Sequence, residues 1–169
     1  MLTAAHKKQQ GVGLIEVLVA LLLLAVAVLG YVALQYRSLD ATVEGGSRVE
    51  AIALARDLAE RIRVNRNAFN VYTTQLKTAD AQTQYTTDCE KTNCSETDMA
   101  DFDVAQVVTK ANVLGMSMNI MQCPKNENSL NCIYVAWGDT SPTNGDGVGD
   151  CTQDNAYHRA STCIIMETY

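Results

Sequence analysis

Hydrophobic residues are concentrated near the start of the chain, in an uncharged run of twenty residues from Val17 to Tyr36. A helix rises about 1.5 Å per residue, so this run spans roughly 30 Å, the thickness of the hydrocarbon core of a bilayer. Lys7 and Lys8 precede the run, which favours an N-terminus in the cytoplasm and the rest of the chain outside. The pattern therefore predicts a single membrane-spanning helix.

The pattern becomes amphipathic after Arg37. Apolar residues then recur at spacings compatible with one helical face, at Leu39, Val43, Val49, Ile52, Leu58 and Ile62. Gly45 and Gly46 interrupt this pattern and would allow a bend, because Gly costs about 1 kcal/mol relative to Ala inside a helix. We expect the helix to end between residues 65 and 70.

The more polar remainder of the chain predicts a small α+β domain. Residues 71–94 are rich in Thr, Gln, Asp and Asn, which indicates a loop. Ser95 with Asp98 three residues later is typical of a helix N-cap, and Gly115 is placed to end that helix. Strand-like runs follow at 116–123, 132–137 and 163–169, with a turn at 126–131 and a long loop at 138–160. We expect an antiparallel sheet packed on the N-terminal helix.

All the cysteines lie after residue 88: Cys89, Cys94, Cys123, Cys132, Cys151 and Cys163. An even number in the part expected outside the membrane predicts disulfides made outside the cytoplasm. Six cysteines allow fifteen connectivities, and the sequence does not choose among them. We expect the pairs that are close in sequence (89 with 94, 123 with 132, 151 with 163), because each would staple a turn or loop that has no core of its own.

Glu16 is the one residue that an ordinary membrane anchor does not explain. It stands at the head of the apolar run, where a carboxylate deep in a membrane would cost about 2.5–3.5 kcal/mol on insertion scales. Such a charge lies at the headgroup boundary or neutralises a cation inside an assembly, and the residue alone leaves both interpretations open.

The sequence around Glu16 resembles a type IV prepilin signal. It reads Lys7-Lys8-Gln9-Gln10-Gly11, followed by Val12-Gly13-Leu14-Ile15-Glu16-Val17-Leu18-Val19-Ala20-Leu21. The resemblance implies cleavage by a prepilin peptidase between Gly11 and Val12 and methylation of the new amine of Val12. Glu16 then falls on the fifth position of the mature chain. The amine of one subunit would pair with Glu16 of another, and each charge would relieve the desolvation of the other.

Three further segments are similar to PilV-type minor pilins, also called type IV pilus modification proteins. They are residues 51–66, residues 94–103 and residues 132–137. Many fibre-forming pilins carry a proline about twenty residues into the mature helix, where this chain has Gly30-Tyr31-Val32-Ala33-Leu34, which favours a low-abundance subunit.

This resemblance implies a structural function, the priming of pilus assembly and of the tip complex. The implied partners are other minor pilins, the major pilin, the prepilin peptidase, the inner-membrane assembly platform and the lipid bilayer. The implied location is the bacterial inner membrane, with the C-terminal domain in the periplasm, and then the fibre or its tip. Four segments are expected: a leader (1–11), a transmembrane and assembly segment (12–36), an amphipathic helix (37–70) and a globular domain (71–169).

Three alternatives remain open. A type II secretion pseudopilin would share the leader and the helix, although the cysteine-rich C-terminal half argues against it. A pilus-tip adhesin would bind a host surface through its loops, but no residue identifies a ligand. Ala25-Val26-Ala27 fits an ordinary signal peptidase site, but the apolar run continues past it, unlike a typical mature start.

Several other functions are disfavoured. The net charge of −6 opposes DNA binding, and the basic cluster at Arg56, Arg61, Arg63 and Arg66 is interrupted by Asp57 and Glu60, as expected of a solvated helix face. The stretch 144–150 suggests a calcium loop, but Pro142 and Gln153 stand where the first and last acids belong. The only histidines are His6 and His158, and no nucleophile motif or Cys-x-x-Cys pair is present. We therefore expect no enzyme activity, no cofactor and no metal.

Overall fold

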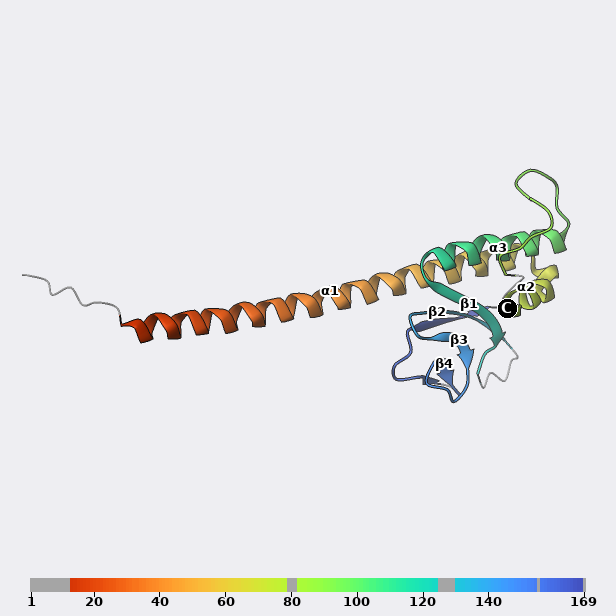
Figure 1. Cartoon of the computed structure of the whole chain (residues 1–169). Helices are drawn as coiled ribbons and strands as arrows, with labels where there is room; N and C mark the ends of the chain where they lie inside the picture. The colour runs from red at the N-terminus through yellow and green to blue at the C-terminus, as the bar shows by residue number, and fades with distance from the viewer. Residues whose placement is uncertain (1–12, 79–81, 125–129, 155, 169) are drawn as a thin grey trace, which may run out of the picture. The chain divides into compact units, whose positions relative to one another are not determined.

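The computed structural model describes residues 13–78, 82–124, 130–154 and 156–168. The chain divides into two compact units, residues 1–44 and 45–169, and helix α1 contributes to both. The described elements are α1 (Leu14–Val64), a 3-10 turn (Arg66–Ala68), α2 (Phe69–Lys77), α3 (Glu96–Val113), β1 (Met116–Gln122), β2 (Asn131–Trp137), β3 (Ser141–Asn144), β4 (Asp150–Gln153), β5 (Ala156–Tyr157) and β6 (Cys163–Thr168) (Figure 1).

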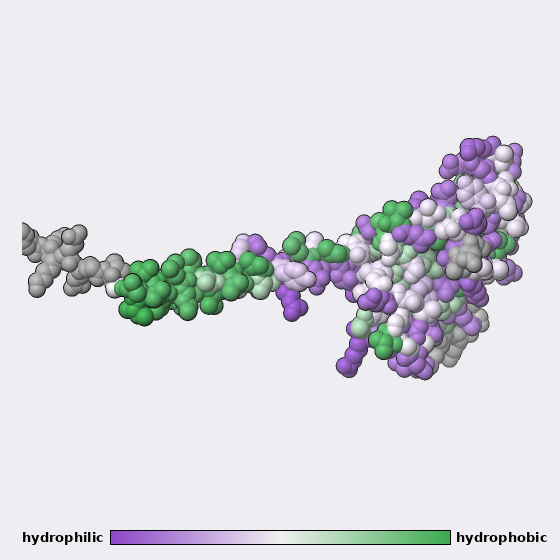
Figure 2. All heavy atoms as spheres, in the orientation of Figure 1, coloured by the Kyte–Doolittle hydropathy of each residue, from purple (hydrophilic) through white to green (hydrophobic). Residues whose placement is uncertain are grey.

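The first unit is the N-terminal part of α1. Every described residue from Gly13 to Val43 is exposed, including each Leu and Val of the apolar run. Figure 2 shows the first part of this helix as a continuous hydrophobic surface, followed by hydrophilic surface. Among the described residues, α1 is the one helix that is long and apolar enough to cross a membrane. An apolar helix without cover of its own needs lipid or other subunits around it.

The second unit has its main core where α1, α2 and α3 meet one face of a sheet. The residues that α1 buries there are Ala51, Leu54, Ala55, Leu58 and Ile62. They recur every three or four positions, which is the spacing of one helical face. The prediction of that face was largely wrong, because only Leu58 and Ile62 of its six residues are buried. Ile52 is partly buried, and the exposed members are Leu39, Val43 and Val49, at 66%, 68% and 68%. Small alanines occupy the face instead.

The main sheet is antiparallel with strand order β1-β2-β6, which confirms the three predicted strands and the α+β fold. The central strand β2 is buried on both faces. Ile133, Val135 and Trp137 belong to the helical core, whereas Tyr134 and Ala136 lie in a second cluster with the cysteines at 123, 132, 151 and 163. This period of two is the expected consequence of the strand pleat. The disulfide-linked segments therefore cover the face of the sheet opposite the helices.

The N-terminus of α3 has the predicted cap. The Ser95 hydroxyl accepts a hydrogen bond from the Asp98 amide at 3.2 Å, and Gly115 follows the helix with a φ of 68°. Glycine is favoured at this position, because it has no Cβ that would clash in the left-handed conformation.

Two segments predicted to be loops contain regular structure. Residues 69–77 form α2, an amphipathic helix that buries Tyr72 and Leu76, which follow Phe69 at spacings of three and four residues. Its threonines are accommodated because the hydroxyls of Thr73 and Thr74 donate to the Asn70 carbonyl at 2.9 and 2.8 Å.

The long segment 138–160 contains β3, β4 and β5, which form a small second sheet in that order. β3 pairs with β4 in parallel, and β4 pairs with β5 antiparallel. These strands have two to four residues and no alternation of apolar and polar positions, so the pattern did not predict them. The predicted turn at 126–131 lies mostly outside the described residues.

Candidate assembly helix and its anchoring network

Glu16 lies in the first turn of α1, where its amide donates to the Gly13 carbonyl at 2.9 Å. It is the only charged residue from Gly13 to Tyr36. Its carboxylate lines a shallow surface recess whose other residues are apolar: Val17, Ala20, Leu21 and Leu24. A helix N-terminus favours a negative charge because its first amides are unpaired. Gly11 and Val12, the predicted cleavage and methylation site, lie outside the described residues.

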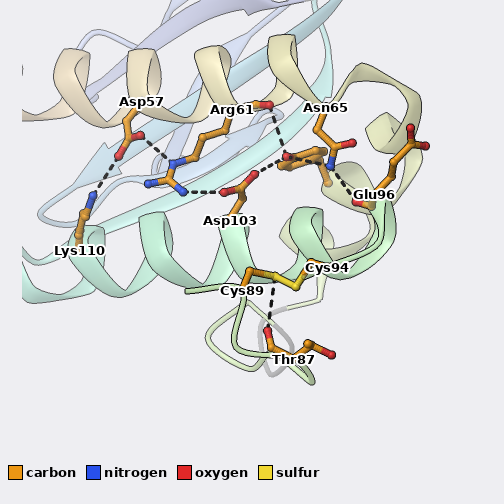
Figure 3. A network of polar contacts seen from close by, with 10 residues as sticks. Asp57, Arg61, Asn65, Thr87, Cys89, Cys94, Glu96, Asp103 and Lys110 are labelled. Carbon is orange, nitrogen blue, oxygen red and sulfur yellow. Dashed lines mark hydrogen bonds and ion pairs between the residues drawn. A yellow bond between two sulfur atoms is a disulfide. The ribbon is translucent and has the colours of Figure 1, made fainter. Parts of the chain in front are cut away.

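Three polar contacts join the C-terminal part of α1 to α3 (Figure 3). Asp57 accepts from the Lys110 ammonium at 3.1 Å, and Arg61 donates to Asp103 at 2.6 Å. Asn65 donates to the Glu96 carbonyl at 2.7 Å. Positions rise along α1 as they fall along α3, so the two helices run antiparallel.

Asp103 is the centre of this network. Asp103 is only 6% exposed. Its two carboxylate oxygens accept separate hydrogen bonds, one from Arg61 at 2.6 Å and one from the Tyr72 hydroxyl at 2.6 Å. A buried carboxylate is tolerated when a cation and further donors satisfy it. Because its partners come from α1 and α2, one side chain of α3 connects all three helices.

Three groups of the network have pKa values shifted by their surroundings. Burial alone would raise the pKa of Asp57, but hydrogen bonds from Arg61 and Lys110 outweigh it and lower the pKa below 3.8. Burial opposes the charge of Arg61, but its bonds to Asp57 and Asp103 outweigh it and raise the pKa of the guanidinium. Burial and the bond to Asp103 raise the pKa of Tyr72 well above its ordinary value. None of these three groups is poised to exchange a proton near neutrality, so the network holds helices together.

Sequence reasoning missed this network. It treated the arginine cluster as a solvated face, whereas Arg61 and Asp57 are only 28% and 33% exposed in their side chains. Their spacing of four residues was a visible signal of an ion pair within one helix. The third member, Asp103, lies 42 residues from Arg61, and no local pattern connects them.

The structure contains the three disulfides expected from the sequence. They join Cys89 to Cys94, Cys123 to Cys132, and Cys151 to Cys163. The first closes a loop before α3, the second joins the end of β1 to β2, and the third joins β4 to β6. In the loop considered for calcium, the Asp150 carboxylate is engaged in hydrogen bonds within the chain. It accepts from the Gly147 amide at 2.8 Å and from the Thr143 hydroxyl. Across the described ranges, no three His, Cys, Asp or Glu side chains are grouped as metal ligands would be.

Comparison with protein families gives two adjoining matches. Residues 6–32 match the prokaryotic N-terminal methylation motif, and residues 33–105 match the family described as type IV pilin Tt1218. No curated protein and no solved structure gives a significant match to the chain. The two matches, the exposed apolar helix and the disulfide-linked α+β domain behind it together support a type IV pilin subunit that carries a prepilin methylation motif.

Proposed function

We propose that the chain is a minor pilin of a type IV pilus, of the PilV type, which takes part in priming assembly and in the tip complex. The match to a type IV pilin family supports the general class. The resemblance of residues 51–66, 94–103 and 132–137 to PilV-type proteins supports the subtype, as does the lack of proline at 30–34.

The proposal assigns a role to each segment. Residues 1–11 are the leader, which a prepilin peptidase removes, and Val12 becomes the methylated N-terminus. Residues 12–36 hold the subunit in the inner membrane and later pack inside the fibre. Residues 37–70 connect this segment to the periplasmic domain, residues 71–169, although the core of that domain begins within α1 at Ala51.

Glu16 is the observation that carries the proposal. An isolated acid in an exposed apolar helix is unfavourable in lipid and gains a partner only in an assembly. Cleavage after Gly11 creates a cation on each subunit. A charge pair between Glu16 and the amine of a neighbour then sets the register of the incoming subunit, since either charge alone is desolvated at a cost. Other minor pilins and the major pilin are the partners, and the inner-membrane platform inserts the subunit.

The mature N-terminus tests this proposal. Protein purified from membranes should start at Val12 with a methylated amine, as read by N-terminal sequencing and intact mass. Gly11→Val should leave the leader attached, whereas Gly13→Ala, a change of similar kind on the other side of the bond, should leave processing intact. A mature protein that retains residues 1–11 would contradict the proposal, and a start at Val28 would indicate a secreted protein.

A further inference from the structure

The second unit carries an apolar groove between α1 and α3 that the described chain leaves open. Its volume is about 530 Å³. It is lined by Glu50, Ala53, Leu54 and Asp57 on α1, and by Thr109, Lys110, Val113 and Leu114 around the C-terminal end of α3. On the α1 side of the groove, Ala53 has a small side chain, so another chain can approach the backbone of α1 closely.

Apolar side chains are exposed along this groove. Val113 is 82% exposed, Leu114 is 43% exposed, and Val49, which precedes the groove on α1, is 68% exposed. Figure 2 shows hydrophobic surface over this end of α3. A single exposed apolar residue needs no explanation, but Val113 and Leu114 in one recess, with Val49 just before it on α1, are typical of a contact site.

The two carboxylates that line the groove differ in their partners. Asp57 is already bound by Lys110 at 3.1 Å and by Arg61 at 2.8 Å. Glu50 has no hydrogen bond or ion pair to any residue that the structure describes. The groove therefore offers an apolar floor with one free carboxylate at its α1 end, which is complementary to an apolar helix that bears a cation.

We propose that this groove receives helix α1 of a neighbouring pilin subunit, with a basic residue of that helix paired to Glu50. The inference rests on the proposed function and names the surface by which the subunit contacts its neighbour. Helix α1 of this chain shows the required chemistry, because Arg37 lies between Tyr36 and Leu39, which are 72% and 66% exposed. A groove that takes a different surface of the next subunit makes a heterologous contact, which does not close a two-fold dimer and is the kind of contact that a helical fibre requires.

Matched substitutions in the full-length subunit test the groove. Val113→Asp places a charge on its wall, and Val148→Asp makes the same change at a residue that is 85% exposed and lies outside it. In piliated cells, sheared fibres and membranes would be compared by quantitative immunoblot. Val113→Asp should lower the ratio of fibre to membrane subunit about tenfold or more, which is 1.4 kcal/mol. Val148→Asp should leave that ratio unchanged. Equal disulfide formation and equal membrane levels would show that both variants fold.

A photocrosslinking amino acid at position 113 identifies the occupant. An adduct that maps to helix α1 of a pilin subunit supports the proposal, and an adduct confined to another protein overturns it. Normal entry of Val113→Asp into fibres also overturns it while leaving the minor-pilin function intact. If the wild-type chain itself is processed but never found in fibres, the proposed function fails and the groove assignment fails with it.

Discussion

At the scale of single residues, Asp103 is a buried acid on which the helical layer converges. Its carboxylate satisfies both the Arg61 guanidinium and the Tyr72 hydroxyl in a nearly dry environment. Exposed ion pairs such as Arg63 with Glu60, at 3.9 Å, contribute little because solvent screens them. Removing one member of a buried network leaves the others desolvated and unpaired, which costs more than the bond itself was worth.

Replacing Asp103 with Ala should therefore lower the free energy of unfolding by about 3 kcal/mol, because Arg61 and Tyr72 both lose their acceptor. The measurement is urea denaturation of the detergent-solubilised full chain. Asp139→Ala is the matched control at an exposed position and should change stability by about 0.5 kcal/mol or less. Equal effects of the two substitutions would show that the network contributes little.

Asp57 makes the stability that the network contributes depend on pH in the acid range. Its pKa in the folded chain is lower than 3.8, so its stabilising contribution is complete above about pH 4 and is lost as the pH falls through the lowered value. Asp57→Asn should lower the melting temperature at pH 7, and this difference from wild type should shrink towards pH 3. Thermal denaturation at both pH values measures it, with Asp139→Asn as control. A difference that stays constant with pH would exclude this linkage.

At the scale of elements, the sheet is held between two unlike layers. One face of β2 packs on the helices through Ile133 and Val135, and the other packs on the disulfide-linked segments through Tyr134. The second layer has short strands and little aliphatic surface, so covalent links replace part of the missing core. Cys151 and Cys163 are almost fully buried in this layer, at 0% and 6% exposure.

The three disulfides should therefore contribute unequally. The double variant Cys151→Ser with Cys163→Ser should lose about 3 kcal/mol of stability, because the bond closes the longest loop and joins β4 to β6. Cys89→Ser with Cys94→Ser should lose less, since that bond closes a loop of only 5 residues' separation outside the core clusters. Melting temperatures of the oxidised full-length proteins provide the comparison. A larger loss for the second variant would contradict this ranking.

At the scale of the whole molecule, the two units differ in where their apolar side chains lie. The described residues of the second unit bury a large apolar core within the chain, although a few apolar side chains such as Val113 stay exposed, whereas the apolar run of the first unit buries none of its residues. The run can therefore pass from lipid to a bundle of similar helices without losing contacts of its own. Under the proposed function, the charge of Glu16 is what favours one axial position in such a bundle over another.

Glu16→Gln should accordingly leave membrane insertion and leader cleavage unchanged but reduce incorporation into fibres about tenfold or more, because the amine of the neighbour loses its counter-charge. The measurement is the ratio of fibre to membrane subunit in piliated cells. Asp40→Asn removes a carboxylate from the same helix beyond the apolar run and should enter fibres normally. Normal entry of Glu16→Gln would remove the register role assigned to Glu16.

Features with a local cause were predictable from sequence. The apolar run, the cap at Ser95, the three main strands and the pairing of neighbouring cysteines each depend on residues close together in the chain. Features that depend on packing were not. The prediction placed Val49 on one helical face with Leu58 and Ile62, but Val49 is exposed, whereas Ala51 and Ala55 are buried in the core.

The sequence by itself determined that this chain has one apolar helix with an acid at its head, followed by a disulfide-linked domain, because hydropathy and charge act over single turns and single strands. Only the tertiary structure decided that Asp103 meets Arg61 across 42 residues, that the segment 138–160 forms a second sheet, and that a groove opens beside Val113. These depend on which surfaces meet when the chain packs, and neither spacing nor composition carries that information.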